Sequence, residues 1–168
     1  MSFKSLCAAT AATLALTTAA FADSQIMVHD AYARSANPKA GAAFMHIMNH
    51  GDEADRLVAV KSDVSARTEL HTHKEDANGV MKMMEVKEGF EIPAGGMHML
   101  KRGGDHVMFM GLNAPFEDGA TVPVTLVFEK AGEVVIDVAV DQKRKPKHGG
   151  AHGGHDHSGH DHSNHGDH

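Results

Sequence analysis

Two methionine-rich segments carry the side chains with the most distinctive chemistry in this sequence. Residues 80–84 read Val-Met-Lys-Met-Met, residues 105–110 read Asp-His-Val-Met-Phe-Met, and His71 lies upstream of both. Thioether sulfur is a soft ligand and imidazole nitrogen a borderline one, so a set of both without carboxylate or thiolate favours Cu(I) over hard cations. A methionine on a strand is also a common core residue. The segments therefore indicate either a Cu(I) site or core packing.

The elements that must position these side chains are short strands separated by turn signals. Asn78-Gly79 is a strong hairpin turn, and Lys130-Ala131-Gly132 joins the last two strands. Such strands without a helical period predict an all-β fold, an antiparallel β-sandwich. We expect the strands near residues 26–34, 43–49, 56–61, 68–73, 80–86, 90–93, 97–101, 106–112, 122–129 and 133–140.

Strand alternation restricts the candidates to one face of each strand, because residues two apart share a face. In the strand 106–112, the branched and aromatic side chains of Val107 and Phe109 are expected to face the core. The other face then carries His106, Met108 and Met110. Two further pairs share a face in the same way: Met81 with Met83, and His71 with His73. If the three strands are neighbours, one His and one Met from each segment can meet.

The joint pattern closely resembles the PCuAC family of periplasmic copper(I) chaperones. The resemblance covers most of residues 25–140, and its most specific part is the block His106 to Leu112. It also includes His71, Gly79-Val80-Met81-Lys82-Met83, Pro93-Ala94-Gly95-Gly96 and Gly103-Gly104. It implies a cupredoxin-like (Greek-key) β-sandwich. It further implies that copper(I) is held near the surface by His71, Met83, His106 and Met108.

The second ligand can be aligned in two ways. Between Met83 and His106 lie 22 residues, one more than the family commonly has. Placing the extra residue in the turn 87–90 selects Met83, which we prefer because a turn absorbs an insertion easily. Counting the family's usual 21 residues back from His106 selects Met84 instead. The secondary candidates are His73, Met81, Met84 and Met110.

The N-terminus has the pattern of a secretory signal peptide, residues 1–22. Lys4 precedes an apolar stretch at 6–20, and Ala20-Phe21-Ala22 is a cleavage signal. We therefore expect an exported, periplasmic protein without a membrane span after cleavage. The only cysteine, Cys7, lies inside this segment, so we expect neither a lipid anchor nor a thiol in the mature chain. The absence of a thiolate excludes a blue-copper centre.

The copper-binding domain is predicted at residues 23–142, followed by a tail at 143–168 that is rich in histidine. The tail cannot bury enough apolar surface to fold and is predicted to be disordered. Its composition indicates binding of Cu(II) or Zn. Its histidines are His148, His152, His155, His157, His160, His162, His165 and His168.

Charge and motif content narrow the function. The net charge of −6 argues against nucleic acid as a partner. No hydrolytic motif is present, and cleavage after Ala22 would leave Asp23 rather than a copper-binding histidine at the N-terminus, so we predict no enzyme. The resemblance implies a chaperone that delivers Cu(I) to the copper centre of cytochrome c oxidase or to a thiol-bearing assembly factor. We expect the protein to be a monomer. The alternative is a periplasmic copper or zinc buffer for metal resistance, with the tail as its main store.

Overall fold

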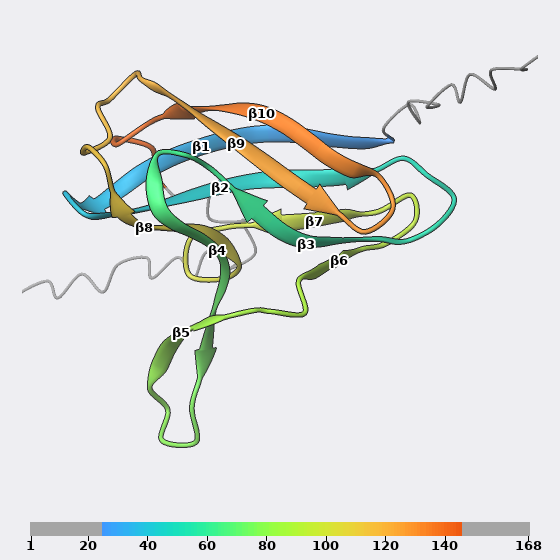
Figure 1. Ribbon diagram of the computed structural model, residues 1–168. Coiled ribbons are helices and arrows are strands. Elements are labelled where there is room, and N and C mark those ends of the chain that lie inside the picture. Colours follow the sequence, from blue (N-terminus) through green and yellow to red (C-terminus); the bar gives the residue numbers. More distant parts are fainter. Residues whose placement is uncertain (1–24, 146–168) are drawn as a thin grey trace, which may run out of the picture.

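The computed structural model describes residues 25–145, which form ten strands (Figure 1). Each predicted strand is present, with ends shifted by a few residues at most. The strands are β1 (Ile26–Asn37), β2 (Ala40–Asn49), β3 (Asp55–Lys61), β4 (Ser65–Glu75), β5 (Met81–Glu85), β6 (Phe90–Ile92), β7 (Met97–Leu100), β8 (His106–Leu112), β9 (Thr121–Phe128) and β10 (Gly132–Val140).

The strands form one hydrogen-bonded path in the order β5-β4-β8-β2-β1-β10-β9-β3-β6. β7 continues beyond the end of β8 along the same edge of β2: β8 pairs with residues 40–43 and β7 with residues 45–48. The pairs are antiparallel except β1–β10, which is parallel. The predicted final hairpin is confirmed, since all of β9 pairs with residues 132–139 of β10.

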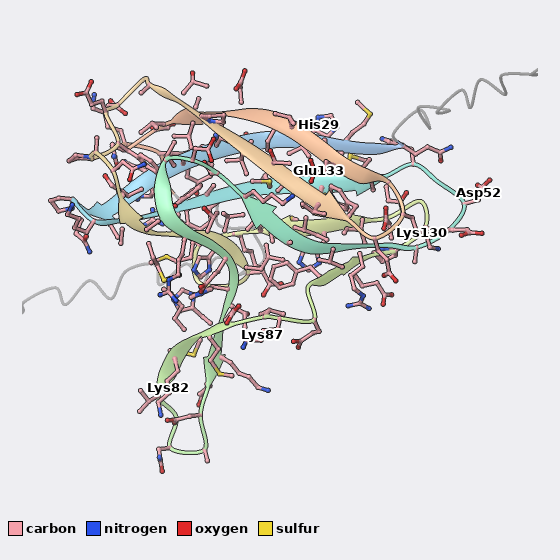
Figure 2. All side chains as sticks on the ribbon, viewed as in Figure 1. His29, Asp52, Lys82, Lys87, Lys130 and Glu133 are labelled. Atoms are coloured by element: carbon pink, nitrogen blue, oxygen red, sulfur yellow. The ribbon has the colours of Figure 1, made fainter. Side chains whose placement is uncertain are left out.

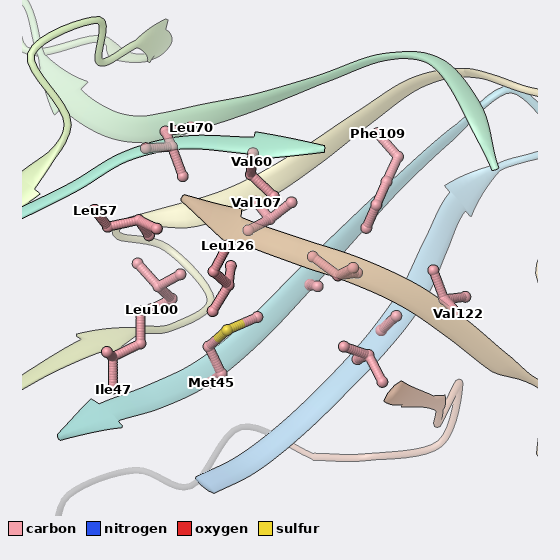
Figure 3. Packing of buried hydrophobic residues seen from close by; sticks show 14 of the residues in the cluster. Met45, Ile47, Leu57, Val60, Leu70, Leu100, Val107, Phe109, Val122 and Leu126 are labelled. Carbon is pink, nitrogen blue, oxygen red and sulfur yellow. The ribbon is translucent and has the colours of Figure 1, made fainter. Parts of the chain in front are cut away.

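The path folds over into two layers, so that β3 and β9 face β2 and β8 (Figure 1). The space between the layers is filled by apolar side chains from both, among them Met45 and Ile47 of β2 and Leu126 of β9 (Figure 3). Burial of these side chains stabilises the fold by about 1.5–3 kcal/mol for each fully buried residue. The predicted all-β sandwich is therefore confirmed.

The β4–β5 hairpin projects from the sandwich (Figure 1). The first part of β4, Ser65–His71, pairs with β8, and the last part, His71–Glu75, pairs with β5. Asp76 closes the predicted turn, because its Oδ1 accepts the backbone N–H groups of Asn78 and Val80, and Gly79 supplies the left-handed conformation at φ 77°. Lys82, on the projecting hairpin in Figure 2, pairs with Asp76 at 2.8 Å.

The predicted signal peptide and all eight tail histidines lie outside the described residues. The described part extends into the segment that the sequence assigns to the tail. There Arg144 lies over the ring of Tyr32, with its guanidinium carbon 4.4 Å from the ring centroid, and pairs with Asp30. Within residues 25–145, no helix is long and apolar enough to cross a membrane.

Candidate metal centre

Three adjacent strands, β5, β4 and β8, carry the candidate ligands on one shared face. His71 is the junction, because it lies opposite Glu85 of β5 and opposite His106 of β8. One position towards the hairpin tip on the same face, His73 lies opposite Met83. Alternation and register therefore place the candidate ligands of all three strands on a common surface.

The faces of β8 are assigned as predicted. Val107 and Phe109 are fully buried in the core, while Met108 and Met110 are half-buried on the other side. His106 is also on the outer side, yet only 2% of its surface is exposed. Its ring lies 6.2 Å from the ring of Phe44, whose side chain also stands on the outer side of β2. The outer face is thus recessed around His106.

A hollow at this position brings together four sequence-predicted candidates. Its lining includes His73, Met83, His106 and Met108. His71 is not part of the lining, but its ring lies 6.0 Å from the ring of His106, centroid to centroid. His73 stacks on His106 at 5.1 Å. Both β4 histidines are therefore close to the hollow.

His71 has one nitrogen engaged and one free. Its Nε2 lies 2.9 Å from Glu69 Oε2, so Nε2 carries the hydrogen and donates a hydrogen bond to the carboxylate. In this tautomer Nδ1 is an acceptor, and it is buried without a hydrogen-bond partner. A buried lone pair without a partner is costly unless something binds it. The arrangement carboxylate–imidazole–free nitrogen is the one that commonly orients a metal-binding histidine.

In His106 the two ring nitrogens have the reverse roles. Its Nδ1 lies 2.9 Å from the carbonyl oxygen of Gly104 and donates to it, which leaves the lone pair of Nε2 for a metal. Burial lowers the pKa of His106, and the neighbouring His73 and His71 lower it further, against the Gly104 hydrogen bond that raises it. The imidazole is therefore neutral, as a ligand must be, at neutral pH.

The structure separates the five methionine candidates. Met83 faces the hollow, whereas Met84 lies opposite Thr72 on the other face of the hairpin. Met81 shares the face of Met83 but lies one step nearer the hairpin tip, opposite Glu75. Met110 Sδ is already contacted by the Arg67 guanidinium at 3.5 Å. Met83 and Met108 are thus the two thioethers that reach the hollow together.

The charged side chains that line the hollow are positive. Arg34 and Arg102 contribute to its lining. Neutral imidazole and thioether ligands do not offset this charge, so a bound monovalent cation would keep its full charge beside two arginines. Such a site holds a soft cation through the ligand bonds rather than through electrostatic attraction. Within residues 25–145, no cluster of three His, Cys, Asp or Glu side chains is suited to a metal ion.

Sequence reasoning missed Glu69 and the Gly104 carbonyl. Glu69 lies two residues before His71 and therefore on the same face of β4, and it lies opposite Met108. The same alternation that selected the ligands could have identified it, given that metal-binding histidines usually donate to a carboxylate or a carbonyl. Gly104 had no such signal, because its carbonyl direction depends on the turn before β8.

A comparison with protein families identifies the chain. A family model described as "Putative lipoprotein LpqE-like" matches residues 26–140. The chain belongs to the LpqE-like family. The LpqE-like region therefore coincides with the ten strands, from the first residue of β1 to the last of β10.

A curated relative of this LpqE-like chain is "Putative lipoprotein Lxx21020" of Leifsonia xyli subsp. xyli. It is 36% identical over 115 residues, which are 68% of this chain and 69% of the relative. The names of the family and the relative both describe lipoproteins. The single cysteine of this chain, Cys7, lies outside the described residues.

Solved structures similar to this LpqE-like chain are PCuAC domains and their relatives, so the chain is PCuAC-like. "Copper-bound PCuAC domain from PmoF2" is 27% identical with a TM-score of 0.57, over 70% of this chain and 93% of that one. "Apo PCuAC domain from PmoF1" is 30% identical with a TM-score of 0.57, over 70% and 94%. The solution structure of CuI-DR1885 from Deinococcus radiodurans is 30% identical with a TM-score of 0.54, over 74% and 86%.

Proposed function

We propose that this protein is an exported copper(I) chaperone. It binds Cu(I) through His71, Met83, His106 and Met108, and it passes the ion to a copper-accepting protein. The observation that carries the proposal is the hollow between β4, β5, β8 and β2. There Met83, His106 and Met108 meet beside His71, whose buried Nδ1 lacks a partner.

The donor set fits a soft ion. Two thioether sulfurs and two neutral imidazole nitrogens match the preferences of Cu(I), whereas hard cations prefer oxygen. His73 is a second-choice ligand, because it lines the same hollow opposite Met83. Support also comes from the similar structures, of which one is described as copper-bound and one as a CuI form.

The same chemistry suits release. The donors carry no charge and Arg34 and Arg102 line the hollow, so a partner that offers thiolates binds the ion more strongly. Met83 lies on the projecting hairpin and is 45% exposed, which lets an incoming ligand attach before the last donor leaves. We propose that the recipient is the copper centre of cytochrome c oxidase or a thiol-bearing assembly factor, and that the carrier acts as a periplasmic monomer without enzymatic activity.

Three measurements test the proposal on the mature protein. With less than one equivalent of Cu(I) bound, X-ray absorption should detect both sulfur and nitrogen scatterers; a shell of nitrogen alone would refute the site. A competition titration should detect one tight Cu(I) site that is lost in Met108→Leu. Transfer to a dithiol acceptor should be complete, since a chaperone must release its ion.

The eight histidines of residues 148–168 favour a second candidate, a copper or zinc buffer. A buffer holds Cu(II) or Zn in several weaker sites of the tail, and deletion of residues 148–168 would remove most of its capacity while Met108→Leu would not. In a chaperone, Met108→Leu removes the tight Cu(I) site, whereas deletion of residues 148–168 leaves it in place. The same deletion tests whether the tail supplies copper to the folded domain, with oxidase assembly as the readout.

A further inference from the structure

A second group of imidazole and thioether side chains lies on the other half of the same sheet layer. It is formed by β1, β2 and β7, and none of its members belongs to the centre described above. We call it the β1–β2–β7 array. Its members are Met27, His29, His46, Met48, Met97 and Met99.

Strand register arranges the array in two adjacent rows. In one row His46 of β2 lies between His29 of β1 and Met99 of β7. In the next row Met48 lies between Met27 and Met97. Directly opposite side chains in antiparallel pairs have Cβ atoms about 5 Å apart, and neighbours two apart on a strand are separated by about 7 Å. The flexible thioethers can therefore converge on one ion with an imidazole.

The array faces solvent. The alternate residues of β2 and β7, Met45, Ile47 and Leu100, are buried in the core, so the array occupies the outer face. Met27, Met97 and Met99 are 48%, 46% and 42% exposed. Among the described residues, the exposed large hydrophobic side chains are methionine or valine, with no leucine, isoleucine or phenylalanine. The exposed valines lie on other strands or in turns, so within the array the exposed apolar surface is thioether surface, which core filling does not explain.

The charges beside the array determine which end holds an ion. A second hollow includes His46 and Met99 in its lining. Its charged side chains are four cations and one carboxylate, so it is positive overall: Lys101, Arg102, Arg144, Lys145 and Asp30. These cations oppose a metal ion at that end of the array. The row of Met27, Met48 and Met97 lies one step farther along β2. A soft cation is therefore best held by this row, with an imidazole of the neighbouring row as an additional donor.

We propose that the β1–β2–β7 array is a second binding site for a soft monovalent cation, Cu(I) in the cell. It is separate from the first centre: on the outer face of β2, Ala42 lies opposite Met108 and the array begins at His46, with Phe44 between them. Four residues of strand correspond to roughly 13 Å. One ion cannot bridge this distance, so the two sites fill independently, and this inference does not depend on the first.

The test uses Ag(I), a soft cation without redox chemistry, and the full mature chain with 13C-labelled methionine methyl groups. No methionine follows Met110, so histidines of the tail do not contribute to these signals. We expect two saturable events: one shifts the methyl signals of Met83 and Met108, and the other shifts those of Met48 and Met97. A single event confined to Met83 and Met108 would overturn the proposal.

Substitutions assign the second event. In Met48→Leu/Met97→Leu the second event should disappear while the first persists, and in Met83→Leu/Met108→Leu the reverse should hold. Met84→Leu, an equally exposed methionine on the far face of the hairpin, should leave both unchanged. If the double variant at the array fails to fold, Met97→Leu alone should weaken the second event at least about tenfold. A second event that persists unweakened in the folded variants would also refute the site, and the exposed methionines would then be an apolar docking surface.

Discussion

Met83 lies directly opposite His73 across the β4–β5 hairpin, whereas Met84 lies opposite Thr72 on the reverse face. The pairing agrees with the lining of the hollow, which includes Met83, His106 and Met108 but not Met84. It favours the alignment in which the extra residue lies in the turn 87–90. That turn follows β5 and is closed by the hydrogen bond from Gly89 N–H to the Val86 carbonyl at 3.1 Å.

The choice between the two methionines gives the first prediction. Met83→Leu should lower Cu(I) affinity by at least about tenfold, equivalent to about 1.4 kcal/mol, because one thioether donor is lost. Met84→Leu should leave the affinity unchanged. Both side chains are about half exposed, so the free energy of unfolding should change by less than about 0.5 kcal/mol in either variant. Competition titration with a Cu(I) chelator measures the affinity, and equal losses would contradict the assignment.

Glu69 is predicted to act by orienting His71. Glu69→Gln should lower Cu(I) affinity by about 10–100-fold, the usual effect of removing the group that fixes a ligand histidine. The matched control is Glu85→Gln, which removes the same charge on the other side of His71 without a hydrogen bond to it. Nitrogen-15 NMR should detect the Nε2–H tautomer of His71 in the wild type and a tautomer mixture in Glu69→Gln. A merely electrostatic role would lower the affinity equally in both variants.

The lowered pKa of His106 predicts the pH dependence of both binding and folding. Burial holds this pKa below the usual value of about 6.5, so His106 stays available to Cu(I) at mildly acidic pH. In the unfolded chain the same imidazole takes up a proton at about pH 6.5. The unfolded state therefore binds more protons between the two pKa values, and the free energy of unfolding falls as the pH drops through that interval.

Denaturant unfolding of the metal-free protein at about pH 7.5 and pH 5.5 measures this loss of stability. It should be smaller in His106→Gln than in the wild type, because glutamine cannot be protonated in the unfolded chain. The same loss in both proteins would show that other groups control the acid sensitivity.

The turn before β6 should require glycine at position 89. Gly89 has φ 71°, and a Cβ there would lie 2.1 Å from the Leu57 carbonyl oxygen. Gly95 has a similar φ of 60°, but nothing lies within 4 Å of its added Cβ. Gly95→Ala should therefore cost about 1–2 kcal/mol of unfolding free energy from backbone conformation alone. Gly89→Ala should cost clearly more, since backbone must also move, and equal losses in thermal unfolding would refute this.

The sequence by itself determined the strands and their faces. Val107 and Phe109 had to face the core because branched and aromatic side chains bury the most apolar surface, and the period of two then placed His106 and Met108 on the opposite face. The turn at Asn78-Gly79 was equally readable, because few residues adopt the left-handed backbone that it needs. These are local preferences, which neighbouring residues along the chain are enough to reveal.

Only the tertiary structure decided which strands are neighbours and in what register. The pairing of His73 with Met83, the junction at His71 and the parallel β1–β10 pair depend on contacts between distant segments. The same holds for the β1–β2–β7 array, whose members are scattered along the chain and looked unrelated in sequence. A shift of one residue in register moves every side chain to the opposite face, so the choice of donors was settled by the packing of the sandwich rather than by any single strand.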